Sequence, residues 1–308
     1  MGLSAGLRGK IKEQAMNHQQ EMDALKTHEI PGRVTVFTGK GGLPAVRVET
    51  ETSEAEVYLH GAHVTAFQKK GGAPLLFMSG ASDFLPNKPI RGGVPVIFPW
   101  FGGREGLPGH GTARITDWDL TESLLLPDGS VRLSFHLPCA EPANVEFIVT
   151  VGHSLVMELA VTNTGTADFT FENCLHTYFQ ISGIHGIEVA GLKGARCHDS
   201  LTGRDSIEEA DSIRFTEETD RIYQDTAATA EIRDPGLGRS IFVRKSGSMS
   251  TVVWNPWIDK AKRMPDFGDD EWPQMVCVES CNVQENAITL APGERSVLRV
   301  EIDSAPLA

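Results

Sequence analysis

Apolar and polar residues alternate one by one over much of this chain, and no other feature restricts its fold as strongly. The alternation is plainest over residues 131–137, 155–161 and 298–302. Because successive side chains of a β-strand point to opposite faces of a sheet, these segments predict strands with one buried face. Residues 146–163 predict a hairpin that turns at residues 152–154.

Further strand-like segments follow one another along the chain and are separated by short turns. They comprise residues 33–39, 45–50, 55–67, 186–192 and 250–255. Turn sequences such as Pro127-Asp128-Gly129 and Asp234-Pro235-Gly236 lie between strand-like segments. Because helical patterns are rare and no linker is evident, the chain is predicted to be all-β, with one large antiparallel β-sandwich domain over residues 31–308.

The first 30 residues differ from the rest of the chain. Residues 9–27 carry a thin apolar stripe at helical spacing, formed by Ile11, Ala15, Met22 and Leu25. The stripe predicts a short N-terminal helix that lies on the main domain and ends at Pro31-Gly32. We therefore expect a helical extension over residues 1–30.

The charge of the chain restricts its partners. Its 308 residues carry a formal net charge of −13, whereas nucleic acids and anionic membranes attract basic surfaces, so we expect neither as a partner. No apolar run approaches the roughly 20 residues that a membrane span requires, and the N-terminus lacks the apolar segment of a signal peptide. We expect a cytoplasmic monomer.

The cysteines and the acidic residues do not form a recognisable metal motif. The cysteines are Cys139, Cys174, Cys197, Cys277 and Cys281. The last two lie four apart, but neither a second pair nor a nearby histidine completes a zinc site, so we expect reduced, buried thiols. The acidic stretch at residues 266–271 does not match a calcium loop and is expected to be solvated. We predict neither a metal nor a cofactor.

A segment rich in glycine and proline is predicted to form a rigid, irregular loop. Residues 88–103 contain three prolines and four glycines around Arg91. Because Gly92-Gly93 adjoin it, this guanidinium is suited to approach a carboxylate or phosphate closely. His110 and Arg114 follow in the next segment. These side chains are either solvated or converge on a basic pocket for an anion.

Two other segments place a single ionisable residue on an apolar strand face. If residues 171–180 form a strand, His176 shares a face with Cys174 and Tyr178. In a later strand, Glu279 shares its face with methionine and cysteine side chains. A buried carboxylate is costly unless it is paired, hydrogen-bonded or functional. The two residues suit general acid–base chemistry if they meet, and the alternative for the histidine is a hydrogen-bonded core residue.

The irregular segments, taken together, resemble one family. The motifs occur in the order IRGGVPVIFPWFG, HGTAR, LHTYF, TDRIY, VVWNPW and FGDDEWPQMVCVES. In this order they are similar to those of the hexose-6-phosphate mutarotases, also called glucose-6-phosphate 1-epimerases, a branch of the aldose 1-epimerase superfamily. The resemblance runs from about residue 42 to about residue 303 and leaves out the N-terminal extension.

The resemblance implies a galactose-mutarotase-like supersandwich with its active site on the concave face of one sheet. It implies that His176 is the general acid and Glu279 the general base, and that no metal or cofactor is needed. The other implied site residues are Arg91 and Arg114 for the phosphate, His110 and Asp220 for the sugar, and Trp100 and Phe101 in the pocket wall. Two positions depart from the family pattern, Thr112 and the segment at residues 280–282.

The implied reaction is the interconversion of the α and β anomers of a hexose 6-phosphate, with glucose 6-phosphate as the expected substrate. We also expect a bound phosphate to raise the pKa of His176. Two alternatives remain open. One is an aldose 1-epimerase that acts on unphosphorylated sugars, and the other is a non-catalytic protein that binds carbohydrate or sugar phosphate.

Overall fold

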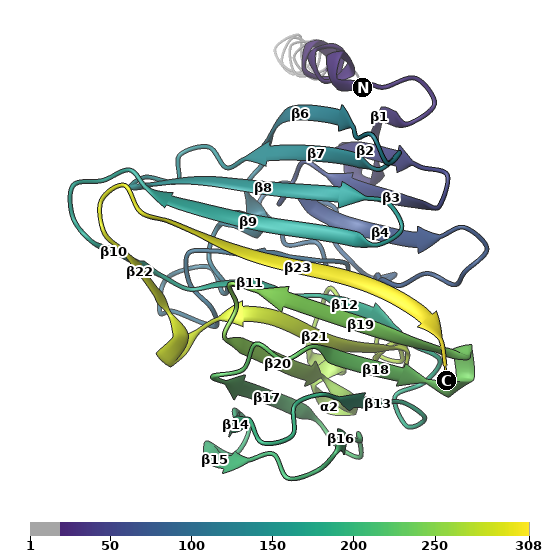
Figure 1. Ribbon diagram of the computed structural model, residues 1–308, viewed down its shortest axis with the longest axis vertical. Coiled ribbons are helices and arrows are strands. Elements are labelled where there is room, and N and C mark those ends of the chain that lie inside the picture. Colours follow the sequence, from purple (N-terminus) through teal and green to yellow (C-terminus); the bar gives the residue numbers. More distant parts are fainter. Residues whose placement is uncertain (1–18, 308) are drawn as a thin grey trace, which may run out of the picture.

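The computed structural model describes residues 19–307, and most of their regular structure is β-strand (Figure 1). A nine-stranded sheet forms one layer, and an eight-stranded and a four-stranded sheet lie behind it. A core of buried apolar side chains joins the three sheets and includes Val46, Phe147 and Val253, one from each sheet. The predicted all-β, antiparallel sandwich is therefore confirmed.

The nine-stranded sheet contains the segments in which the alternation is plainest. In spatial order its strands are β16 (Ser212–Ile213), β13 (Glu188–Ala190), β18 (Ala230–Asp234), β19 (Arg239–Ser246), β23 (Arg295–Pro306), β9 (Leu155–Asn163), β8 (Ala143–Val151), β7 (Val131–His136) and β6 (Asp119–Leu125). The predicted hairpin is formed by β8 and β9, with Val151 opposite Leu155. Phe147 and Leu159 are paired across it and fully buried.

The eight-stranded sheet is built from short strands. In order they are β15 (Arg204–Ile207), β14 (Arg196–Asp199), β17 (Thr219–Gln224), β20 (Ser250–Asn255), β21 (Met275–Asn282), β11 (Asn173–Leu175) and β5 (Val96–Ile97), with β12 (Tyr178–Gln180) also paired to β21. The single strand expected over residues 171–180 is therefore divided. Phe171 belongs to a strand of another sheet, and the remainder is interrupted at His176 and Thr177. The physical reason is local, since the Thr177 N–H bonds to the Leu175 carbonyl instead of to the neighbouring strand.

Two smaller sheets complete the structure. The four-stranded sheet runs in the order β1 (Val34–Thr38), β2 (Pro44–Glu49), β3 (Ser53–Tyr58) and β4 (His63–Lys69), and a two-stranded sheet pairs β10 (Phe169–Phe171) with β22 (Ile288–Leu290). The strands expected over residues 33–39, 45–50 and 55–67 are therefore present, the last as a hairpin of two strands.

Helical elements are few and short. Within residues 19–307, α-helix is found at residues 19–25 and in α2 (Trp257–Arg263). The 3-10 turns are η1 (Lys26–His28), η2 (Lys40–Gly42), η3 (Ala113–Ile115), η4 (Pro235–Leu237), η5 (Trp272–Gln274) and η6 (Gln284–Asn286). In the described part of the chain, no helix is long and apolar enough to cross a membrane.

The N-terminal extension packs on the sandwich where it is described. Residues 19–25 are helical and lead into η1, which ends before the turn at Pro31-Gly32. Met22 is buried in the main core, and Leu25 packs against that core. This part of the predicted helix therefore lies on the domain as expected, whereas residues 9–18 lie outside the described residues.

Candidate active site

A cavity of about 500 Å³ opens on one face of the eight-stranded sheet. Strands β12, β21, β20 and β17 contribute Tyr178, Glu279, Trp254 and Asp220 to its lining. Seven of the eight site residues named from the sequence line this cavity: Arg91, Phe101, His110, Arg114, His176, Asp220 and Glu279. Segments that are up to about 190 positions apart in the chain therefore converge on one space.

His176 and Glu279 meet because their strands pair. Strands β12 and β21 place Tyr178 opposite Cys277, so His176, two residues earlier, falls opposite Glu279. The His176 Nε2 atom lies 3.3 Å from Oε1 of Glu279, and both side chains are buried. The imidazole also stacks on the Tyr178 ring, with 4.9 Å between the ring centroids. The face shared with Cys174 and Tyr178 is thus as predicted.

The glycine- and proline-rich segment holds His176 from the other side. The His176 N–H donates to the Pro95 carbonyl at 3.1 Å, and the Tyr178 N–H donates to the Gly93 carbonyl at 2.9 Å. Gly93 adopts a φ of +57°, and a Cβ there would stand 2.3 Å from the Val64 carbonyl oxygen. Only glycine allows this close approach.

Burial shifts the pKa values of the pair in opposite directions. Burial lowers the pKa of His176 well below its usual range, and the nearby His110, Arg114 and Arg91 lower it further. Burial raises the pKa of Glu279 well above its usual range, although the Cys174 thiol, which donates to Oε2 at 3.3 Å, opposes the shift. Both shifts favour the neutral form. Without a bound anion, the environment therefore favours a neutral imidazole beside a protonated carboxyl group.

Arg91 is held firmly at the cavity wall. Its Nε and Nη2 atoms donate to Asp266 Oδ2 at 3.2 and 3.0 Å, and Nη1 donates to the Tyr178 hydroxyl at 2.9 Å. Burial alone would lower the pKa of Arg91, but Tyr178 and Asp266 outweigh it and raise the pKa. Asp266 is 9% exposed, so the expectation that residues 266–271 form a solvated loop is wrong at this position. Its carboxylate is buried because it pairs with the guanidinium.

Arg114 lies in the same cavity with fewer partners. Its Nη2 atom donates to the Gly109 carbonyl at 2.7 Å, whereas its buried Nε has no hydrogen-bond partner among the described residues. Burial, reinforced by the nearby Arg91, lowers the pKa of Arg114 to about 10. The guanidinium thus remains charged near neutral pH and keeps an unused donor, as expected of a group that receives an anion.

His110 and the two aromatic residues expected in the wall behave differently from one another. Burial and the nearby Arg114 lower the pKa of His110 to about 3, so its ring is neutral, and Nδ1 accepts a bond from the Gly102 N–H. Phe101 packs edge-on against this ring.

Trp100 does not line the cavity, contrary to expectation. Its Nε1 donates to the Pro108 carbonyl, and the Arg104 guanidinium covers its ring.

The structure adds residues that the sequence analysis did not select. Lys260, on α2, lines the cavity, with its Nζ 3.6 Å from Asp220 Oδ2 and 3.4 Å from Glu218 Oε1. The same ammonium lies 5.6 Å from the centroid of the Trp254 ring. The motif VVWNPW, which ends three residues before Lys260, pointed to this part of the chain as a part of the site. Nothing in the sequence, however, distinguishes Lys260 from Lys262 as the cavity residue.

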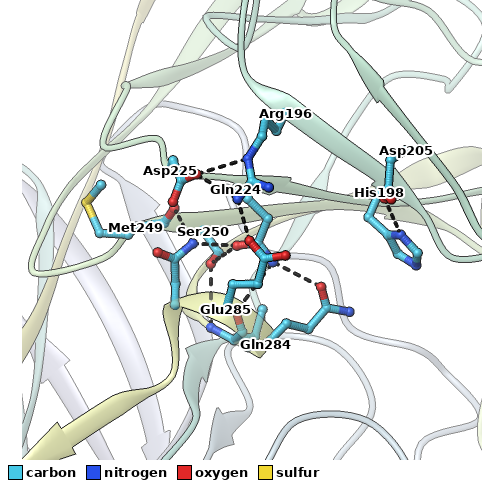
Figure 2. Close-up of polar contacts among 11 residues, drawn as sticks. Arg196, His198, Asp205, Gln224, Asp225, Met249, Ser250, Gln284 and Glu285 are labelled. Atoms are coloured by element: carbon cyan, nitrogen blue, oxygen red, sulfur yellow. Dashed lines mark hydrogen bonds and ion pairs between the residues drawn. The ribbon is translucent and has the colours of Figure 1, made fainter.

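A second, polar cleft of about 560 Å³ adjoins the cavity, and Gln284 lines both. Figure 2 shows that side chains in and next to this cleft bond to one another: Arg196 to Asp225 and Glu285, His198 to Asp205, and Gln224 to Ser250 and Gln284. These contacts bind η6 to strands β14 and β17 at the rim of the cavity. We assign the cleft a structural role.

The cavity thus combines two chemical functions. An imidazole and a carboxyl group 3.3 Å apart can give and take protons on a bound molecule. Arg91, Arg114 and Lys260 supply positive charge that suits an anionic group on the same molecule. The described residues also contain two sets of side chains close enough to hold a metal ion, and both include Glu279. One set adds Cys174 and Cys281, and the other adds His176 and Cys277. Three nearby cations disfavour such an ion.

Comparisons with known proteins find relatives that match most of the chain. The family model described as Aldose 1-epimerase matches residues 44–303. A protein from Cenchrus ciliaris named "Putative glucose-6-phosphate 1-epimerase" is 36% identical over 269 residues, 82% of each chain. A protein of the same name from Escherichia coli K12 is 32% identical over 252 residues, which cover 79% of this chain and 84% of the other.

Solved structures give the same picture of the fold. A protein from Salmonella typhimurium described as a "putative mutarotase" superposes with a TM-score of 0.83 at 27% identity, and the match covers 91% of this chain and 96% of that one. A galactose mutarotase-like protein from Clostridium acetobutylicum, at 13% identity, shares the fold with a TM-score of 0.63. The predicted galactose-mutarotase-like sandwich is therefore confirmed. The chain belongs to the aldose 1-epimerase family of isomerases.

Proposed function

We propose that the protein interconverts the α and β anomers of hexose 6-phosphates, with glucose 6-phosphate as the main substrate. The observation that carries this proposal is the presence of a buried His176–Glu279 pair and two half-buried arginines in one cavity. An enzyme for unphosphorylated sugars has no need of Arg91 and Arg114 there. The names of the relatives from Cenchrus ciliaris and Escherichia coli point to the same substrate.

In the proposed mechanism the pair moves two protons in concert. Glu279 takes the proton of the C1 hydroxyl while His176 gives one to the ring oxygen, and the bond between C1 and the ring oxygen breaks. The resulting aldehyde rotates about the C1–C2 bond. The ring then closes onto the opposite face of C1 as the two groups exchange their roles. No electrons and no groups are transferred, so the proton count of the pair is restored by each turnover.

The phosphate group prepares the pair for this step. Without a bound anion, burial and the two arginines disfavour the imidazolium, and burial outweighs the opposing charge of Arg114 to favour a protonated Glu279. A phosphate dianion bound at Arg91 and Arg114 offsets their charge and favours the imidazolium. Both arginines lower the pKa of His176, whereas Arg114 is the one that lowers the pKa of Glu279. Offsetting their charge therefore raises the pKa of the imidazole more than that of the carboxyl group, and the single proton of the pair moves from Glu279 to His176. The carboxyl group then becomes a base and the imidazole an acid.

The arginines supply binding energy at a distance from the reacting carbon. Arg91 is fixed by Asp266 and Tyr178, so the phosphate meets an already oriented donor. Energy gained at the phosphate is available to hold C1 against the pair.

Replacing Arg114 tests the phosphate role. Arg114→Met is preferable to a change at Arg91, because its loss leaves no buried carboxylate without a partner. We expect kcat/KM for glucose 6-phosphate to fall roughly 10- to 100-fold, the effect of losing a hydrogen bond to a charged group, while exchange of free glucose changes little. Equal losses for the two sugars would contradict the proposal.

A further inference from the structure

Three cysteine thiols surround the His176–Glu279 pair on one face of the eight-stranded sheet. Cys277 and Cys281 lie two residues on either side of Glu279, and Cys174 lies directly opposite Cys281. All three side chains are fully buried. From the sequence they are expected to be ordinary buried thiols, and they have no part in the mechanism proposed above.

One of these thiols contacts the base directly. The Cys174 Sγ–H donates to Oε2 of Glu279 at 3.3 Å, while Oε1 faces His176. The carboxyl group is 1% exposed, so water cannot replace a missing donor without entering the core. A hydrogen bond donated to a carboxylate stabilises its ionised form.

We propose that Cys174 is a positioning residue that tunes the basicity of Glu279 by donating its thiol proton to Oε2. The inference rests on the proposed function, in which Glu279 must become ionised to take the proton of the C1 hydroxyl. Cys174 itself touches no substrate, because it does not line the cavity.

The other groups near Glu279 do not duplicate this contact. The ionisable groups that face it are His176, Tyr178, Asp220 and Arg114, together with the remaining two thiols. The negative charge of Asp220 raises the pKa of Glu279, whereas the positive charge of Arg114 lowers it. Within the described residues, the Cys174 thiol makes the hydrogen bond to Oε2. Removing it therefore shifts the proton of the pair toward Glu279.

The geometry suits a donor of moderate strength. A thiol is a weaker donor than a hydroxyl group, so it stabilises the carboxylate without holding it permanently ionised. A carboxylate that is too stable would be a poor base for the C1 hydroxyl, and one that is too unstable would keep its proton. We therefore expect the catalytic rate to fall both when position 174 carries a stronger donor and when it carries none.

Infrared difference spectroscopy measures this effect without turnover. The C=O stretch of the protonated Glu279 side chain is assigned by its absence in Glu279→Gln, and its intensity is followed against pH. We expect Cys174→Ala to move the midpoint to higher pH by about one unit, equivalent to the loss of a modest hydrogen bond to a charged group. Cys174→Ser retains a donor and is expected to return the midpoint to the wild-type value or below.

Cys277→Ala is the matched control. It removes the same sulfur atom from an equally buried side chain on the same face, and Cys277 makes no hydrogen bond to Glu279 among the described contacts. Its midpoint should stay at the wild-type value. An unchanged midpoint in Cys174→Ala, or an equal shift in the control, would overturn the proposal. If Cys174→Ala does not fold and Cys174→Ser does, a Cys174→Ser midpoint above the wild-type value would overturn the proposal.

Kinetics provide an independent readout. We expect kcat for glucose 6-phosphate to fall in Cys174→Ala while KM changes little, because the phosphate-binding arginines are untouched. If the wild-type protein fails to exchange the anomers, the proposed function fails, whereas the infrared titration still decides whether Cys174 tunes Glu279. A fall in kcat without a shift of the infrared midpoint would count against the tuning role.

Discussion

At the scale of single residues, the site depends on burial. His176, Glu279 and Tyr178 are each at most 8% exposed, and the pKa values of all three are shifted toward the neutral form by burial first. A neutral pair in an empty cavity avoids the cost of an isolated buried charge. The substrate supplies the charge that changes this balance.

The pKa of His176 should therefore respond to phosphate. In the empty protein we expect its ring to titrate below about 6.5, the usual value for histidine, and to shift upward when inorganic phosphate is added. Two-dimensional NMR of the imidazole ring, assigned with His176→Asn, measures both values. His185, which is exposed and not part of the cavity lining, is the internal control. A pKa that stays the same or falls with phosphate would rule out the proposed proton shift.

At the scale of elements, the important feature is the interrupted strand β11–β12 between β21 and the segment of residues 93–97. The sequence alternation predicted the shared face of Cys174, His176 and Tyr178, but it did not show the break at Thr177. Which strand pairs with which is decided by contacts between residues about 80 to 100 positions apart, and a local pattern carries no such information. For the same reason the pairing of Asp266 with Arg91 was not predictable.

A glycine substitution tests this element. Gly93→Ala would place a Cβ 2.3 Å from the Val64 carbonyl oxygen at a φ of +57°, so the segment must move away from His176. We expect a loss of stability of at least about 1 kcal/mol and a clear loss of anomer exchange.

Gly103→Ala is the control, because a Cβ there has no neighbour within 4 Å and the backbone φ is ordinary. Urea unfolding and exchange kinetics of the two variants provide the comparison. Equal behaviour of the two variants would show that the close approach at Gly93 does not position the site.

At the scale of the whole molecule, the sandwich buries several ionisable groups that are neutral when folded. Burial lowers the pKa of His63 to about 3, and its Nε2 bonds to the Gly92 carbonyl at 2.8 Å. The all-β class and the single alternating pattern were visible in the sequence, as was the N-terminal extension. The burial of His63 was not, because its ring contacts Gly92, which lies 29 positions later in the chain.

The stability of the fold should fall in acid. Below about pH 6.5 the unfolded chain protonates His63, whereas the folded protein does so only near pH 3. The unfolded state thus binds more protons, and the stability decreases as the pH falls through this window, by up to about 1.4 kcal/mol per pH unit for this residue. Urea unfolding of the wild type and His63→Gln at several pH values measures the difference. Identical slopes for the two proteins would contradict the assignment.

The central claim is that His176 and Glu279 exchange the anomers of a hexose 6-phosphate. The most direct measurement is NMR saturation transfer between the anomers of glucose 6-phosphate and, separately, of free glucose, with the wild type and Glu279→Gln. We predict accelerated exchange of glucose 6-phosphate far above that of free glucose, and its loss in the variant. Binding of glucose 6-phosphate without acceleration by the wild type would contradict the account and leave a sugar-phosphate-binding protein.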